Sequence, residues 1–105
     1  MRFIETAVFT EDITGFLSDA EYGRLQVALL LRPEQGPVIP GSGGLRKVRW
    51  GAAGRGKRGG LRIVYYWVPA EDICLMLYVY AKNVQGDLTA AQIKGLRQVV
   101  REEFG

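Results

Sequence analysis

Basic residues are concentrated in one short stretch of this sequence, where they could bind a phosphate-bearing ligand. Seven of the fourteen lysines and arginines fall in it, and no aspartate or glutamate occurs from Gln35 to Ala70. The formal net charge of +3 therefore understates the positive field that a polyanion would meet here. The seven residues are Arg46, Lys47, Arg49, Arg55, Lys57, Arg58 and Arg62.

Nucleotide hydrolysis is one chemistry that this stretch suggests. Residues 51–57 match G-x-x-x-x-G-K, the start of a phosphate-binding loop. Arg58 stands, however, where that motif needs a serine or threonine to hold magnesium. The loop also leads into an expected strand, whereas the motif must open a helix. The sequence therefore disfavours nucleotide hydrolysis.

RNA or DNA binding is the second possibility. Alternation places Lys47 and Arg49 on one face of an expected strand, and Arg62 opens the next strand. The glycine-rich segment between them carries Arg55, Lys57 and Arg58, which could follow a nucleic-acid backbone together with Arg46. Tyrosines at 66, 78 and 80 could stack on bases. A solvated basic loop with tyrosines packed in the core is an equally acceptable interpretation.

Such a surface could also cleave RNA, because RNA breaks when its 2′-hydroxyl attacks the adjacent phosphate. The protein must align that hydroxyl, neutralise the charge that builds on the phosphate and assist proton transfer. Lys47, crowded by Arg46 and Arg49, is the candidate base, since nearby cations favour loss of its proton. We expect no metal and no cofactor, because the basic stretch carries no carboxylate ligand.

The elements that position these residues predict an α+β fold, a single domain over residues 1–105. A short strand is expected over 2–8, a weak helix over 10–17, and a helix that Ser18 and Glu21 cap and that ends near Leu31. Three strands follow at 45–50, 61–68 and 73–80, and then a helix capped by Thr89 and Gln92. This order favours a small twisted antiparallel sheet packed against two N-terminal helices and one C-terminal helix.

Alternation predicts which face of each strand is buried. In the last strand, Ile73, Leu75, Leu77 and Val79 are expected to share one face, opposite Cys74, Met76, Tyr78, Tyr80 and then Lys82. Cys74 is expected to act as a small core residue, and the two tryptophans to pack. Asp87 is expected to be a turn residue before the last helix.

The remaining composition indicates a cytoplasmic protein. The N-terminal residues lack the features of a signal peptide, and the longest apolar run, at 27–31, is too short to span a membrane. A single cysteine allows no internal disulfide, and there is no histidine to act as a base or zinc ligand.

Several motifs give this sequence a resemblance to a known family. The motifs that carry the resemblance occur in this order over residues 39–100: GSGGLRKVRW, GRGKRGGLRIVYYW, LYVYAKN, and DLT with Gln92. Over these residues the chain resembles the RelE/ParE superfamily of bacterial toxins, particularly its HigB-like branch. The resemblance implies a RelE-like fold and the toxin of a type II toxin–antitoxin pair. It implies an endoribonuclease, or mRNA interferase, that cuts mRNA on the ribosome, with a cognate antitoxin protein as partner and no membrane association.

The resemblance also implies roles for individual residues. Lys47 would be the base, with Arg49 as a phosphate contact; Arg62 would hold the scissile phosphate, and Lys82 matches a further basic site position. Asn83 stands where ribosome-dependent relatives often carry arginine, and Thr89 where some carry a catalytic tyrosine. The proton donor stays open between Lys82, Tyr80 and the charge of Arg62. Two alternatives also stay open: a ParE-like inhibitor of DNA gyrase that is not an enzyme, and an RNA-binding module without turnover.

Overall fold

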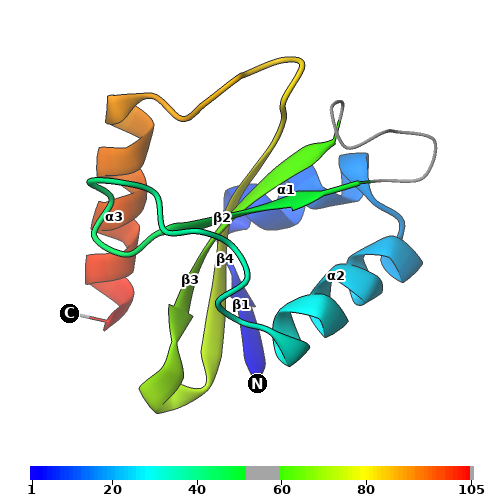
Figure 1. Cartoon of the computed structure of the whole chain (residues 1–105), viewed down its shortest axis with the longest axis horizontal. Helices are drawn as coiled ribbons and strands as arrows, with labels where there is room; N and C mark the ends of the chain where they lie inside the picture. Colours follow the sequence, from blue (N-terminus) through cyan, green and yellow to red (C-terminus); the bar gives the residue numbers. More distant parts are fainter. Residues whose placement is uncertain (52–59, 105) are drawn as a thin grey trace.

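The computed structural model describes residues 1–51 and 60–104, which form a four-stranded sheet with helices on both faces (Figure 1). This arrangement confirms the expected α+β class. In these ranges no helix has the length and apolar character that crossing a membrane requires. The elements are β1 (Arg2–Glu5), α1 (Ala7–Phe16), α2 (Asp19–Leu31), β2 (Arg46–Trp50), β3 (Leu61–Val68), the short 3-10 helix η2 (Pro69–Glu71), β4 (Ile73–Ala81) and α3 (Ala90–Phe104).

The strands lie in the order β1-β4-β3-β2. β2, β3 and β4 form the antiparallel arrangement that their short connections predict. β1 adds a parallel edge, with Phe3 opposite Cys74. No tight turn joins β1 to β4, so local sequence does not determine their relative direction. The sheet is therefore mixed, with its antiparallel part as expected.

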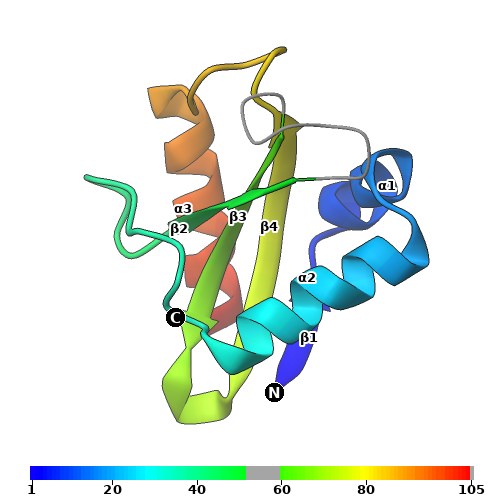
Figure 2. The same cartoon turned by 45° about the vertical axis from the view of Figure 1, so that its right-hand side comes forward.

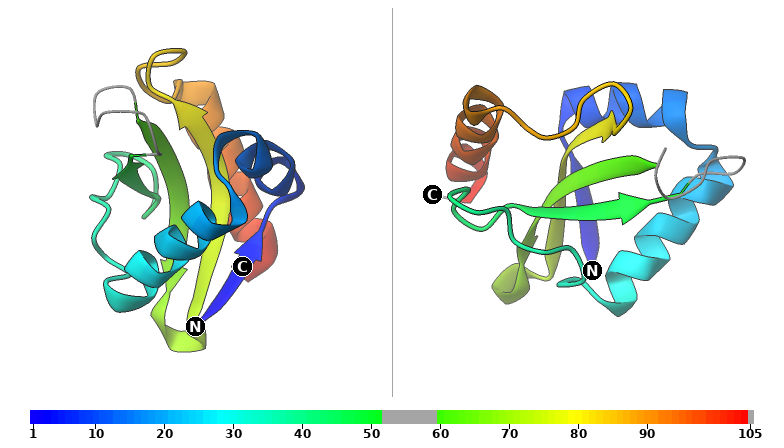
Figure 3. Two further views of the ribbon diagram at one scale, coloured as in Figure 1. Left: turned by 90° about the vertical axis from the view of Figure 1, so that its right-hand side faces the viewer. Right: turned by 45° about the horizontal axis from the view of Figure 1, so that its top comes forward.

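The helices divide between the two faces of the sheet (Figures 2 and 3). On one face, Phe9 and Ile13 of α1 and Leu25 and Leu29 of α2 are buried in a core with residues of all three antiparallel strands. On the other face, α3 covers a second core with half-buried side chains. The α3 residues packed there are Leu96, Val99, Val100 and Phe104.

An irregularity in the pairing of β3 with β4 makes one of the expected faces wrong. The register passes from Val64 opposite Tyr78 to Tyr65 opposite Met76, so Leu77 has no partner on β3. Beyond this bulge the alternation of β4 changes face. Leu75 and Leu77 pack in the α3-side core, whereas Val79 packs with Cys74 and Met76 on the other side. Tyr80 consequently lies on the α3 side, away from Cys74 and Met76.

Helix caps explain where the helices begin. The Ser18–Glu21 capping box is present, as expected. Thr89 and Gln92 form the second box: the Thr89 hydroxyl accepts from the Gln92 amide at 3.1 Å, and the Gln92 side chain accepts from the Thr89 amide at 2.9 Å. The expected start of the first helix at residue 10 is wrong, because Thr6 caps α1 by accepting from the amide of Phe9. The first strand correspondingly ends at Glu5 rather than residue 8.

The single cysteine is a core residue, as expected. Cys74 is fully buried on the α1 and α2 side of the sheet. Burial raises the pKa of its thiol to about 12, because an apolar surrounding disfavours the thiolate. Trp50 and Trp67 pack against the same core, in agreement with the packing role expected for them.

Candidate functional site

The pairing of the three antiparallel strands brings the predicted site residues of β2 and β3 onto one face. Arg49 lies opposite Arg62, and Arg62 lies opposite Tyr80. Lys47, two residues before Arg49, lies opposite Val64, which belongs to the α3-side core. Directly opposed residues of antiparallel strands project to the same side. Lys47, Arg49 and Arg62 therefore share the face of the sheet that α3 covers.

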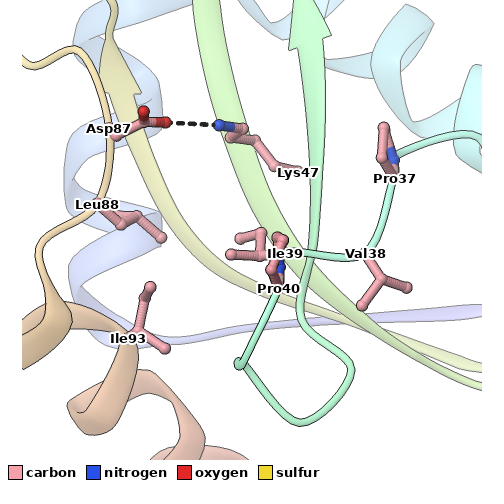
Figure 4. Close-up of a pocket in the computed structure, with 8 residues that line it drawn as sticks. All are labelled: Pro37, Val38, Ile39, Pro40, Lys47, Asp87, Leu88 and Ile93. Atoms are coloured by element: carbon pink, nitrogen blue, oxygen red, sulfur yellow. Dashed lines mark hydrogen bonds and ion pairs between the residues drawn. The ribbon is translucent and has the colours of Figure 1, made fainter.

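An ion pair connects this face to the segment before α3. Lys47 Nζ lies 2.9 Å from Asp87 Oδ1, as Figure 4 shows. The hydrogen bond from Lys47, followed by the charge of Lys47, holds the pKa of Asp87 below its ordinary value. The charges of Lys82 and Arg62 lower it further. Three of the predicted cations thus act on one carboxylate.

We refer to Lys47, Arg49, Arg62 and Lys82 as the cationic cluster. Lys82 joins it because its amide donates to the carbonyl of Gly60 at 3.2 Å, beside the start of β3. Lys82 and Arg49 are exposed, and the Lys47 side chain is 29% exposed. The cluster therefore offers solvent-facing cations from β2 and from the turn after β4.

Arg62 differs from the others because it is buried, with 3% of its surface exposed. Its Nη1 donates to the carbonyl of Leu61 at 3.3 Å. Within residues 1–51 and 60–104, no acidic side chain lies at ion-pair distance from it. A buried charge without a counter-ion is costly, so an anionic ligand would be stabilising here. Contact with a phosphodiester would require neighbouring groups to move.

Tyr80 carries an unsatisfied hydroxyl. This oxygen is buried, and in the described part of the chain no group meets hydrogen-bond geometry with it. Burial and the charge of Asp87 raise the pKa of Tyr80, while the charges of Lys47 and Arg62 oppose that rise. Lys47 also approaches the hydroxyl closely enough to lower this pKa, although the geometry falls short of a hydrogen bond. The ring is packed beside Tyr78, with centroids 6.0 Å apart, and the residue is only 4% exposed. The expectation that Tyr80 stacks on a base therefore finds no support, and its hydroxyl is the group that faces the cations.

The other predicted RNA-binding residues differ in where they lie relative to the cationic cluster. Arg46 points away from the cluster, and its Nη1 donates to the carbonyls of Glu34 and Gly36 at 3.2 and 2.9 Å. Asn83 is exposed in the turn after β4, next to Lys82. The predictions for Arg55, Lys57 and Arg58 fall outside the described residues. The structure thus brings together the four residues expected to be catalytic and separates Arg46 from them.

Asp87 is the site residue that sequence reasoning missed. It occupies a turn, as expected, but its carboxylate pairs with a lysine 40 positions earlier in the chain. The turn is held by side-chain amides: Gln85 donates to the backbone carbonyl of Asp87 at 2.9 Å and also bonds Gln92. Gln92 in turn reaches the Tyr78 hydroxyl at 3.4 Å. The capping box of α3 therefore also positions Asp87.

The arrangement suits an anionic ligand. Among the described residues, no three side chains of aspartate, glutamate, cysteine or histidine come together in a group that could hold a metal ion. Cations from β2, β3 and the turn after β4 lie near one carboxylate and one buried phenol, so charge neutralisation and proton transfer are the chemistry available. No protein-family model matches the chain.

Proposed function

We propose that this protein is the toxin of a type II toxin–antitoxin pair and that it cuts mRNA on the ribosome as a metal-independent endoribonuclease. The observation that supports this most is the meeting of Lys47, Arg62 and Lys82 around Asp87, beside the unpartnered hydroxyl of Tyr80. Cations from distant segments at one point are what a phosphodiester in a charged transition state requires. The same residues carry the family resemblance.

In this proposal the side chains divide the work of transesterification. Lys47 would take the proton of the 2′-hydroxyl after release from Asp87. Arg49 and Arg62 would neutralise the charge that builds on the phosphate. Tyr80 or Lys82 would return a proton to the leaving 5′-oxygen. The Tyr80 hydroxyl suits this role because it is buried beside the charges of Lys47 and Arg62 and has a proton to give.

The partners follow from the same proposal. A cognate antitoxin would have to cover the cationic cluster or block access to it. An acidic surface on the antitoxin would complement the charge of the cluster. The ribosome would supply the mRNA and help to align it for in-line attack. Such a toxin would act in the cytoplasm.

The test is to express the chain with and without the neighbouring reading frame and to sequence the 5′ ends of cellular RNA. We expect cuts within translated codons and growth arrest, both suppressed by the neighbouring protein. Arg49→Ala, an exposed position, should reduce cleavage by roughly 100-fold. Arg24→Ala, an exposed arginine on α2, is the matched control and should cut like the parent.

Other outcomes would favour the alternatives. Double-strand breaks in DNA without new RNA ends would indicate a gyrase inhibitor. Salt-dependent RNA binding with unchanged message lengths would indicate a binding module without turnover. Full cleavage by both Arg49→Ala and Lys47→Ala would show that the cationic cluster is not the active site.

A further inference from the structure

A pocket lies against the cationic cluster on the α3 side of the sheet. It has a volume of about 420 Å³ and lies between residues 37–40, Lys47, the segment 87–88 before α3, and Ile93 of α3. Figure 4 shows Leu88 and Ile93 on the left, Ile39 and Pro40 to their right, and the Lys47–Asp87 ion pair above them. The pocket is thus apolar on its walls and charged along one edge.

The walls of this pocket are held in place by hydrogen bonds. The amide of Ile39 donates to the carbonyl of Leu45 at 2.7 Å, and the amide of Lys47 donates to the carbonyl of Pro37 at 3.1 Å. Residues 37–39 therefore run as an extra segment along the edge of β2. On the opposite wall, the Thr89–Gln92 capping box sets the start of α3. A ligand would meet a preformed pocket, which lowers the ordering cost of binding.

Lys47 belongs both to this pocket and to the cationic cluster. A ligand that uses both must present an apolar surface and an anion within the reach of one side chain. A nucleotide does so, because its base is a flat ring and its phosphate is one sugar away. Unpaired bases of single-stranded RNA are commonly bound in this way. The carboxylate of Asp87, which is 82% exposed, could accept a hydrogen bond from the N–H edge of the base.

We propose that this pocket receives the base of a nucleotide whose phosphate lies against the cationic cluster, an inference that rests on the proposed function. In an RNA substrate the occupant is the base next to the phosphate that is cut. A free nucleoside monophosphate has the same chemistry, so the experiment must separate the two sources.

Methyl NMR spectra of the intact chain test the pocket without any substitution. The probes are a 2′-O-methyl RNA oligonucleotide, which cannot cleave itself, the four nucleoside monophosphates, and ribose 5-phosphate. We expect the methyl signals of Leu88, Ile93 and Ile39 to shift with the oligonucleotide and to stay unchanged with ribose 5-phosphate. Equal shifts with nucleoside monophosphates at similar concentrations would assign the pocket to free nucleotides rather than RNA and would overturn the RNA form of the inference.

A filling substitution provides the second measurement. Leu88→Trp should block the pocket and weaken oligonucleotide binding by about tenfold, the loss expected for one bound base. Val84→Trp is the matched control, because Val84 lies in the same connection, is 84% exposed and does not line the pocket. It should bind like the parent. If Leu88→Trp does not fold, Ile39→Trp fills the pocket from the opposite wall.

The outcomes separate this inference from the proposed function. Suppose that mRNA is cut on the ribosome, but the pocket methyl signals do not shift and both filling variants bind RNA fully. This result would overturn the base pocket and leave the proposed function standing. Shifted methyls and weakened binding by the filling variants, without any mRNA cleavage, would support the base pocket and overturn the endoribonuclease proposal.

Discussion

Lys47 on β2 and Asp87 before α3 form an ion pair of 2.9 Å across 40 positions of sequence. The pair joins the strand that carries two of the predicted catalytic cations to the segment that leads into the last helix. The sequence had suggested that only cations surround Lys47, but the structure places a carboxylate beside it. A carboxylate at this point repels a phosphodiester and occupies the lysine that the proposed chemistry needs.

Asp87→Asn should therefore tighten RNA binding. Freeing one cation should make the slope of log affinity against log salt concentration steeper by roughly 0.7 for a single strand. Fluorescence anisotropy across a salt series measures this slope.

Glu71→Gln is the control for Asp87→Asn, since it changes the net charge equally at an exposed position of η2, on the β3–β4 turn. It should leave the salt slope unchanged. Loss of cleavage by Asp87→Asn with unchanged binding would instead assign Asp87 a catalytic role.

In the parent, the stabilising effect of the Lys47–Asp87 ion pair should be present above the pH at which an unfolded aspartate titrates, about 4. It should be lost as the pH falls through the lowered pKa of Asp87.

Tyr80→Phe separates a catalytic hydroxyl from a packing ring. The substitution removes a buried oxygen that has no hydrogen-bond partner in the described residues, so the free energy of unfolding should stay the same or rise by up to about 1 kcal/mol. Cleavage should fall by roughly 100-fold if this hydroxyl donates the proton. Urea denaturation and cleavage on purified ribosomes give the two numbers.

Tyr66→Phe is the corresponding control, because Tyr66 stacks on Phe104 at the C-terminal end of α3, whereas Asp87 lies just before its N-terminal end. It should cut RNA at the parental rate. Parental activity in Tyr80→Phe as well would leave Lys82 as the proton donor to test.

Gly36 positions β2 by allowing a close backbone approach. A Cβ at this residue would lie 3.0 Å from the carbonyl carbon and oxygen of Lys47 and 3.0 Å from Cε1 of Tyr65. Its amide also donates to the Tyr65 hydroxyl at 3.0 Å, which in turn donates to the carbonyl of Pro33 at 2.7 Å. Gly36→Ala should therefore destabilise the fold by about 1–3 kcal/mol, because the crowded groups are backbone atoms.

A second glycine makes the comparison direct. Gly95 lies within α3, and a Cβ there would meet nothing within 4 Å. Gly95→Ala should stabilise the protein by up to about 1 kcal/mol, since alanine favours a helix. Thermal melts of both variants check the opposite signs. Equal melting temperatures for Gly36→Ala and the parent would mean that β2 can shift to accept the methyl group.

The sequence predicts those parts of the fold that depend on local chemistry. Capping boxes at Ser18 and Thr89 and the alternation of β2 and β3 follow from neighbouring residues, and the structure contains them. The bulge opposite Val64 and the parallel edge strand do not follow, because both depend on how distant strands meet. The bulge matters for the site, since it changes the face on which Tyr80 lies relative to Cys74 and Met76.

The site shows the same division. The cations of β2 and β3 could be placed together because a short connection makes these strands neighbours. The position of Asp87 beside Lys47 could not be predicted, because the ion pair depends on the course of residues 82–89 from β4 to α3. The alternation of side chains also could not predict that Arg62 is buried and Arg49 exposed, since the two residues lie opposite each other on the same face of the sheet.

Thr89 tests whether a residue beside the site has a structural role alone. Its hydroxyl caps α3, and its neighbours Leu88 and Asp87 line the pocket. Thr89→Ala should cost about 1 kcal/mol of stability and lower the melting temperature by roughly 4–8 °C. Cleavage measured well below that temperature should stay near the parental rate, and Thr89→Ser should retain both properties. A Thr89→Ala variant that melts like the parent but no longer cuts RNA would assign this hydroxyl to the reaction. A variant that melts at a lower temperature and loses activity only near that temperature would confirm that Thr89 acts as a helix cap.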